Sequence, residues 1–327
     1  MNRTVRLGVG VALLGGVIAL ALIPTTLKSV YVDLAFNTLL LVFLCSSWNL
    51  VAGFTGQLSL AHGAFYGIGA LVTTTVAIGW EITPYLGMPL GAAVGAGYAA
   101  LIGYVAFRRS VAGLYFAVLT LAFGFLALGF ARQAPVLNGT SGAFFPVTND
   151  PGMFVLDRRE IYFYVMLGMV VAVVAFVAWL GRSRLGYRWK AVRGNERAAE
   201  AVGISPFRHK LGALTLSAAL TALAGGFNAV YLLYFSPDLH FGLALQLQIL
   251  LATLLGGIGT VWGPVLGAAF VSVLTFYLRQ LPIEGPTLTA IPPMITAAII
   301  AVVAYFLTDG IVGGLRRLRR SRVPVRE

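Results

Sequence analysis

Few side chains in this 327-residue sequence could do chemistry, and most of those are uncharged. The histidines, His62, His209 and His240, lie far apart in different surroundings, which predicts no metal site. None of the three lysines stands in the glycine-rich pattern that binds nucleotide phosphates. No Ser-His-Asp spacing favours acyl transfer. The sequence therefore predicts that the chain is not an enzyme and binds no metal or cofactor itself.

Neutral polar residues lie inside apolar segments, where each costs free energy unless it is hydrogen-bonded or faces water. Gln57, Ser59 and His62 adjoin a glycine-rich interruption, so we expect them to line a polar path. Thr120 and Gln248 are further candidates for this path. For each residue the alternative is a hydrogen bond between helices. Intramembrane acids are almost missing, which disfavours a proton-coupled transporter.

The longest strongly polar run is Ser183 to Lys210, between two long apolar segments. Asn195 can cap a short helix, and Gly203 can end it in a left-handed conformation. Ser205 and Pro206 then predict the start of the next helix. The short helix would have a small apolar face, formed by Ala198, Ala199, Ala201 and Val202. Such a helix is marginal alone, so we expect it to dock on another protein; the alternative is a solvated loop.

Composition places these residues in a polytopic membrane protein. The chain is 59% hydrophobic and 10% charged, with a mean hydropathy of +0.88. At roughly 20 residues per crossing, we expect an all-α bundle of eight to ten spans, forming one transmembrane domain over 1–327. The single cysteine, Cys45, excludes a disulfide within the chain.

The apolar pattern predicts ten spans, or eight if the glycine-broken stretches are re-entrant. The expected spans are 7–27, 30–51, a third from about His62 to Trp80, 85–107, 112–131, 160–181, 211–235, 242–256, a ninth from Gly263 to Arg279, and 288–308. The helix breaks fall in corresponding halves, at Gly53 and Gly56 and at Gly256, Gly257 and Gly259. Paired breaks are typical of a transport path. The alternative is close helix packing through GxxxG pairs.

The basic residues predict the orientation. Of the 23 lysines and arginines, 18 fall on one side, in the N-terminal residues, Arg108 and Arg109, the loop 182–210 and the tail 315–327. The positive-inside rule makes that side cytoplasmic, with both termini inside. The net charge of +12 therefore indicates membrane orientation and not a nucleic-acid partner.

Taken together, these segments resemble the permease subunits of bacterial branched-chain amino acid ABC importers, and in particular the M-type permease of the pair. The resemblance covers roughly residues 35–310. The matching stretches are Asn49–Phe65, Gly113–Ala122, Ser183–Gly186, Asn195–Ile204, Leu255–Thr260 and Trp262–Ala268. Gln248 stands where the family often has Glu.

The resemblance implies that residues 191–204 form a cytoplasmic coupling helix that inserts into an ATPase subunit. The candidate coupling residues are Arg193, Asn195, Glu196, Ala199, Glu200 and Gly203. It also implies a homologous second permease, two ABC ATPase subunits that hold ATP and Mg²⁺, and a periplasmic solute-binding protein, all at the inner membrane. The expected solute is a branched-chain or related amino acid; urea or another small amide is the alternative. A scaffold or an ATP-independent channel is less favoured, because it would not need the 182–210 loop.

Overall fold

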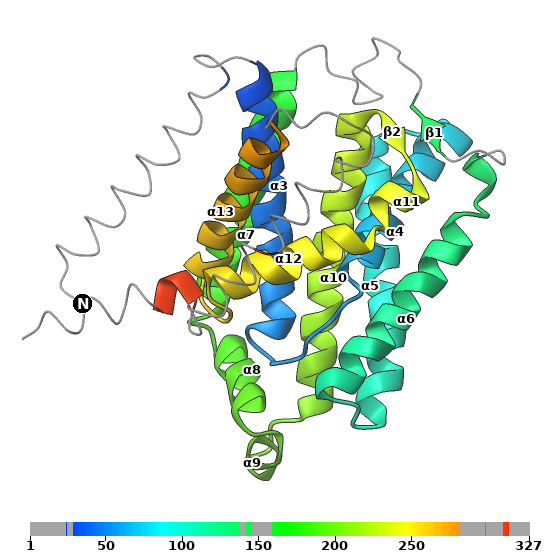
Figure 1. Ribbon diagram of the computed structural model, residues 1–327. Coiled ribbons are helices and arrows are strands. Elements are labelled where there is room, and N and C mark those ends of the chain that lie inside the picture. Colours follow the sequence, from blue (N-terminus) through cyan, green and yellow to red (C-terminus); the bar gives the residue numbers. More distant parts are fainter. Residues whose placement is uncertain are drawn as a thin grey trace, which may run out of the picture.

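The computed structural model describes residues 29–137, 142–145, 159–280 and 310–313, with Pro24 and Ala298 as isolated positions. The predicted spans 7–27 and 288–308 and the basic tail lie outside the described residues. Most of the long helices stand roughly side by side (Figure 1). They are α3 (Ser29–Ala52), α4 (His62–Thr74), α5 (Pro84–Arg108), α6 (Gly113–Ala131), α7 (Arg159–Leu180), α10 (Pro206–Leu232) and α13 (Trp262–Arg279). The helical bundle predicted from the sequence is therefore confirmed.

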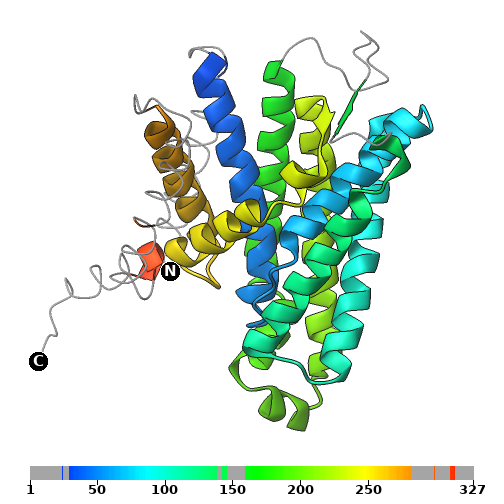
Figure 2. The same ribbon diagram turned by 45° about the vertical axis from the view of Figure 1, so that its right-hand side comes forward.

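Shorter elements connect these helices. Below the bundle lie α8 (Arg184–Gly194) and α9 (Glu196–Ala201), which project beyond its end in both views (Figures 1 and 2). At the opposite end are η1 (Thr75–Gly79), η2 (Pro135–Leu137) and α11 (Pro237–His240). A departure from the all-α prediction is one antiparallel ladder that pairs β1 (Ala143–Phe144) with β2 (Tyr234–Phe235).

Six of the described helical stretches are long and apolar enough to cross a membrane. Their outward faces are apolar: on α6, Leu114, Tyr115 and Phe130 are 77%, 82% and 70% exposed. A soluble protein rarely exposes apolar surface on this scale, whereas lipid covers it without cost. The chain is thus a multi-pass membrane protein, while the total of eight to ten spans stays a prediction.

The glycine-broken segments give shorter helices than the others. At 1.5 Å per residue, the 13-residue α4 extends only about 20 Å, against roughly 30 Å of hydrocarbon. Its last turn continues as the π-helix η1, so the expected end near Trp80 is confirmed. Between α11 and α13, α12 (Leu243–Gly256) lies across the upright helices (Figure 1). The predicted span 242–256 is therefore a helix, but one that does not run along its neighbours.

Glycine allows α4, α5 and α10 to pack with their backbones nearly touching. A Cβ at Gly69 of α4 would overlap the Ala222 carbonyl of α10, and one at Gly225 of α10 would overlap the Tyr66 carbonyl of α4. Gly91 of α5 lies against the backbone of Gly69. Because backbone atoms cannot move aside as side chains do, these contacts fix the three helices against each other. Close glycine packing therefore holds for this layer, although of these three glycines only Gly91 belongs to a GxxxG pair.

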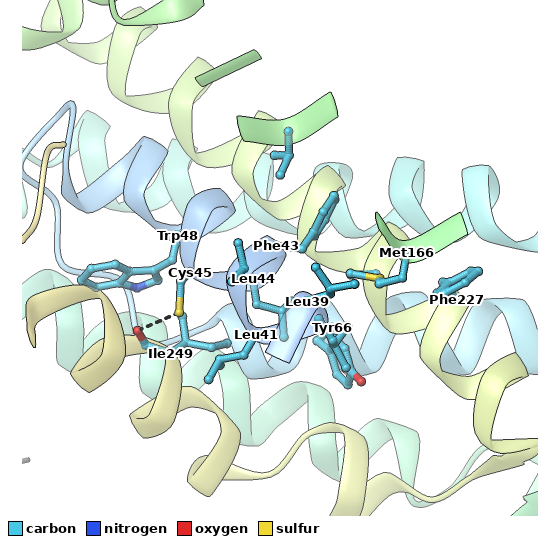
Figure 3. Packing of buried hydrophobic residues seen from close by; sticks show 14 of the residues in the cluster. Leu39, Leu41, Phe43, Leu44, Cys45, Trp48, Tyr66, Met166, Phe227 and Ile249 are labelled. Carbon is cyan, nitrogen blue, oxygen red and sulfur yellow. Dashed lines mark hydrogen bonds between the residues drawn. The ribbon is translucent and has the colours of Figure 1, made fainter. Parts of the chain in front are cut away.

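Helix α3 lies against α7, α10, α12 and α13 and carries much of the buried apolar core. Figure 3 shows Leu44, Cys45 and Trp48 of α3 facing Ile249 of α12, with Met166 and Phe227 farther along the same cluster. Cys45 is buried and donates its S–H to the Ile249 carbonyl at 3.6 Å. A large rigid core of this kind holds the end of α3 in a fixed position.

Candidate functional site

The two predicted helix breaks are real, and one side chain joins them. The first break, residues 53–61, follows α3; the second, residues 257–261, follows α12. Asn49, wholly buried on the last turns of α3, donates to the Thr260 carbonyl at 2.9 Å and accepts from the Gly259 N–H at 2.8 Å. An amide can do both at once because its NH₂ donates while its oxygen accepts. Asn49 thus satisfies two backbone groups that the broken helix leaves free.

Positive φ angles explain why these breaks are glycine-rich. Gly56 has φ +75°, Gly257 +118° and Gly259 +79°, conformations that other residues adopt only with strain. Gly53 instead lies directly against the Asn49 side chain, where a Cβ would overlap the amide. Gly256 packs against the Gly263 backbone across the second break. The predicted break residues therefore serve both turn geometry and close packing.

A buried polar group holds the first break to α12. Gln246 of α12 accepts from the Gly63 N–H at 3.0 Å and donates to the Ser59 carbonyl at 3.3 Å. Trp48 donates to the same carbonyl at 2.9 Å. Gln246, on the neighbouring helix α12, therefore satisfies a backbone N–H in the first turn of α4. A local N-cap residue would otherwise play this role.

The predicted path residues do not all meet. Ser59 and Gln57 are buried in the break, and Thr120 of α6 accepts from the Leu60 N–H at 2.9 Å, which fixes the same segment. Gln248, however, is only half-buried, and Gln246, two residues earlier, faces the break. The spacing of two on a helix turns the side chains about 200° apart, so only one of them can point inward. Gln246 is the residue that the sequence-based choice missed.

His62, at the start of α4, forms a buried chain of hydrogen bonds. Its Nε2 lies 2.7 Å from Ser217 Oγ, and that hydroxyl donates to the Ser47 carbonyl at 2.6 Å. Because a hydroxyl has one proton to give, Nε2–H must be the donor to Ser217. In the neutral ring Nδ1 is then an acceptor, and it has no hydrogen-bond partner among the described residues. Gln57 Oε1 is a second buried acceptor that has no hydrogen-bond partner among the described residues.

The polar run after α7 forms two capped helices, of which only the second, between Asn195 and Gly203, was predicted. The expected coupling helix 191–204 is therefore divided at Asn195 between α8 and α9. Ser183 accepts from the Gly186 N–H at 3.1 Å, and Asn195 both ends α8 and caps α9 by accepting from the Ala198 N–H at 3.1 Å. Gly203 has φ +83° and ends α9. The next helix, α10, begins at Pro206, so the loop expected to reach 210 stops near 205, because Pro206 pre-sets the first helical turn.

The expected coupling residues divide between two faces. Asn195, Glu200 and Gly203 are exposed. Ala199, in contrast, is 3% exposed and packs inside the chain, so it is wrong to place it on an outward apolar face. That face is formed by Ala198, Ala201 and Val202 instead; Val202 is 73% exposed.

Glu196 and Arg193 also make contacts within the chain, although Arg193 as a whole is exposed. Glu196 Oε1 lies 2.5 Å from Nζ of Lys210, a buried residue of α10 whose ammonium is 5.5 Å from the centre of the Phe107 ring. Arg193 donates to the Gly53 carbonyl of the first break. Nearby, Trp189 of α8 is 2% exposed and packs edge-on against Phe54, with ring centres 6.5 Å apart. The segment that projects from the bundle is thus tied to α10 and to the first break.

The chain is similar to known transport permeases. A family described as "Branched-chain amino acid transport system / permease component" matches residues 30–308. The high-affinity branched-chain amino acid transport system permease protein LivM of Salmonella typhimurium is 30% identical over 235 residues, 63% of this chain and 54% of that protein. LivM of Escherichia coli is 29% identical with the same coverage.

A more distant relative is the probable branched-chain amino acid transport permease protein LivH of Methanocaldococcus jannaschii. It is 26% identical over 196 residues, 57% of this chain and 61% of that protein. The chain therefore spans little more than half the length of the LivM proteins that it matches. No solved structure matches it.

Proposed function

Because this chain belongs to the branched-chain amino acid transport system permease family, we propose that it is the membrane-spanning permease subunit of an ATP-binding-cassette importer. It would translocate branched-chain or related amino acids, with ATP and Mg²⁺ held by a separate ATPase subunit. The observation that supports this best is the projecting pair α8 and α9, whose far side is exposed and whose near side contacts the first helix break. A passive pore has no use for such a connection.

The partners follow from this proposal. One ATPase subunit would bind the exposed small-residue face of α9 on the cytoplasmic side. A homologous permease would complete the path and bind the second ATPase subunit. A solute-binding protein would deliver its cargo at the opposite end, where β1, β2 and α11 lie (Figure 1). The distribution of lysines and arginines supports an inner-membrane location with both termini in the cytoplasm.

The chemistry of the break supports a solute that carries N–H donors. His62 Nδ1 and Gln57 Oε1 are both buried acceptors with no hydrogen-bond partner among the described residues. A buried unpaired acceptor costs free energy, which an entering N–H donor would recover. The ammonium group of an amino acid is such a donor, and so is the amide of urea, the alternative cargo. Uptake assays with leucine, isoleucine, valine and urea in parallel would separate the two.

The central experiment is reconstitution in proteoliposomes with the ATPase subunits, the second permease and the loaded solute-binding protein. ATP-dependent amino acid uptake is expected, and deletion of 193–203 should abolish both uptake and co-purification of the ATPase. Uptake that proceeds without ATP would indicate a channel and contradict the proposal.

A sharper test of docking uses Gly203. Its added Cβ would meet nothing within 4 Å, so substitution acts through the backbone alone. Gly203→Val disfavours the φ of +83° by about 1–2 kcal/mol, whereas Asn tolerates it. We expect Gly203→Val to lose uptake and substrate-stimulated ATP hydrolysis while membrane insertion is kept, and Gly203→Asn to keep both. Equal transport by the two variants would contradict a docking role for this turn.

A further inference from the structure

Arg193 lies where three parts of the chain meet, which are α8 itself and the two helix breaks. Its guanidinium donates to the Gly53 carbonyl in the first break. The same guanidinium lies against Gly259 in the second break, since a Cβ added there would overlap Nη1. Its aliphatic stem lies over Gly56, where an added Cβ would be 3.0 Å from Arg193 Cγ. One side chain from the projecting segment therefore reaches both breaks.

Gly56 in the first break and Gly259 in the second have no side chain, which makes the contact with Arg193 possible. Gly56 and Gly259 have φ +75° and +79°, which already favours glycine. Each also leaves the space that the Arg193 side chain occupies. These glycines therefore have a second role that φ alone does not reveal, which is to seat a residue of the cytoplasmic segment.

Electrostatics favour a cation at this position. Gly53 directly follows the carboxyl end of α3, and Gly259 lies shortly after the carboxyl end of α12. The unpaired carbonyls at helix carboxyl ends carry partial negative charge. Arginine suits such a site because its planar guanidinium offers five donors, whereas a lysine ammonium acts as a single point charge.

The two breaks are already linked to each other through Asn49, which holds Gly259 and Thr260 to the end of α3. Trp189 adds an apolar contact between α8 and Phe54 of the first break. A displacement of α8 therefore has a direct physical route to both breaks. The other attachment of the segment, Glu196 to Lys210, leads to α10 instead.

We propose that Arg193 is a positioning residue that transmits displacement of the α8–α9 segment to both helix breaks, instead of contacting the ATPase. This inference rests on the proposed importer function. It reverses the role expected from the sequence, in which Arg193 belongs to the docking surface.

The test compares Arg193→Gln and Arg193→Lys with Arg188→Gln, a control at another exposed arginine of α8, in the full reconstituted importer. For Arg193→Gln we expect normal ATPase co-purification and basal ATP hydrolysis. Uptake and its stimulation of hydrolysis should fall roughly 5- to 150-fold, the usual range for coupling between sites. Arg193→Lys should fall between Arg193→Gln and the wild type. Uptake by Arg193→Gln equal to that of Arg188→Gln would overturn the proposal, as would loss of ATPase binding.

A second variant reaches the same contact from the opposite side. Gly259→Ala should displace the guanidinium and reproduce the loss of uptake with basal hydrolysis kept. The matched control is Gly113→Ala, which has a comparable φ of +60° but no neighbour within 4 Å of its Cβ. Equal losses in the two alanine variants would mean that backbone strain alone acts, which would overturn the proposal. Failure of the importer function itself would be distinguishable, because the wild type would then show no ATP-dependent uptake.

Discussion

Two regions of this bundle are held together in opposite ways. In the layer of α4, α5 and α10, glycines bring backbones into contact, as at Gly69 and Ala222. The two helix breaks are joined to each other and to α8 by side-chain hydrogen bonds, as at Asn49 and Arg193, although Gly256 and Gly263 also pack backbone to backbone across the second break. Backbone contacts have no alternative arrangement, whereas side-chain hydrogen bonds can exchange partners. The comparison indicates a rigid layer beside a region able to rearrange.

The largest effect is expected where backbones touch. Gly69→Ala would force a Cβ into the Ala222 carbonyl, which no rotamer can relieve. We expect a loss of at least about 3 kcal/mol, the upper part of the overpacking range, visible as low yield and early thermal unfolding in detergent.

The matched control is Gly97→Ala on α5, where the added Cβ meets nothing within 4 Å. It should leave the unfolding temperature unchanged or slightly raised, because alanine is the better helix former. If Gly69→Ala were as stable as this control, the layer could not be called rigid.

An intermediate effect is expected at the link between the breaks. Asn49→Ala would leave the Gly259 N–H and the Thr260 carbonyl without their partner, at a cost of about 2 kcal/mol. Uptake should fall more than stability does, because the second break loses its attachment to α3.

Asn37→Ala is the control, since Asn37 lies exposed on the same helix and, within the described residues, bonds only locally, to the Asp33 carbonyl. It should retain normal uptake and stability. Equal behaviour of the two variants would remove the distinction between the break region and the rest of α3.

The smallest effect is expected where the projecting segment is tied to the rigid layer. Glu196→Gln should cost only about 1–2 kcal/mol, because the Glu196 side chain is 41% exposed although Lys210 is 4% exposed. Lys210→Met, which removes the buried charge itself, should cost less than Glu196→Gln. Thermal unfolding of the two variants measures the difference. A larger loss of stability for Lys210→Met than for Glu196→Gln would mean that the Glu196–Lys210 pair is screened and does not fix α9 to α10.

The sequence by itself determined the membrane class, the helix breaks and the two ends of the short helix α9, at Asn195 and Gly203. These depend on local properties: apolar length, glycine at positive φ, and a polar residue such as Asn195 placed one position before a helix. Each can be read from neighbouring residues, without knowledge of the fold.

Only the tertiary structure decided which side chains meet. Whether Gln246 or Gln248 faces the break depends on the rotation of α12 about its own axis. Ala199 is buried because α9 contacts α8 and α10. Asn49 and Thr260 are 211 residues apart. No local sequence pattern can pair residues at that distance. Arg193 was identifiable as a basic residue in a polar run, but its inward direction depends on where two distant glycines come together.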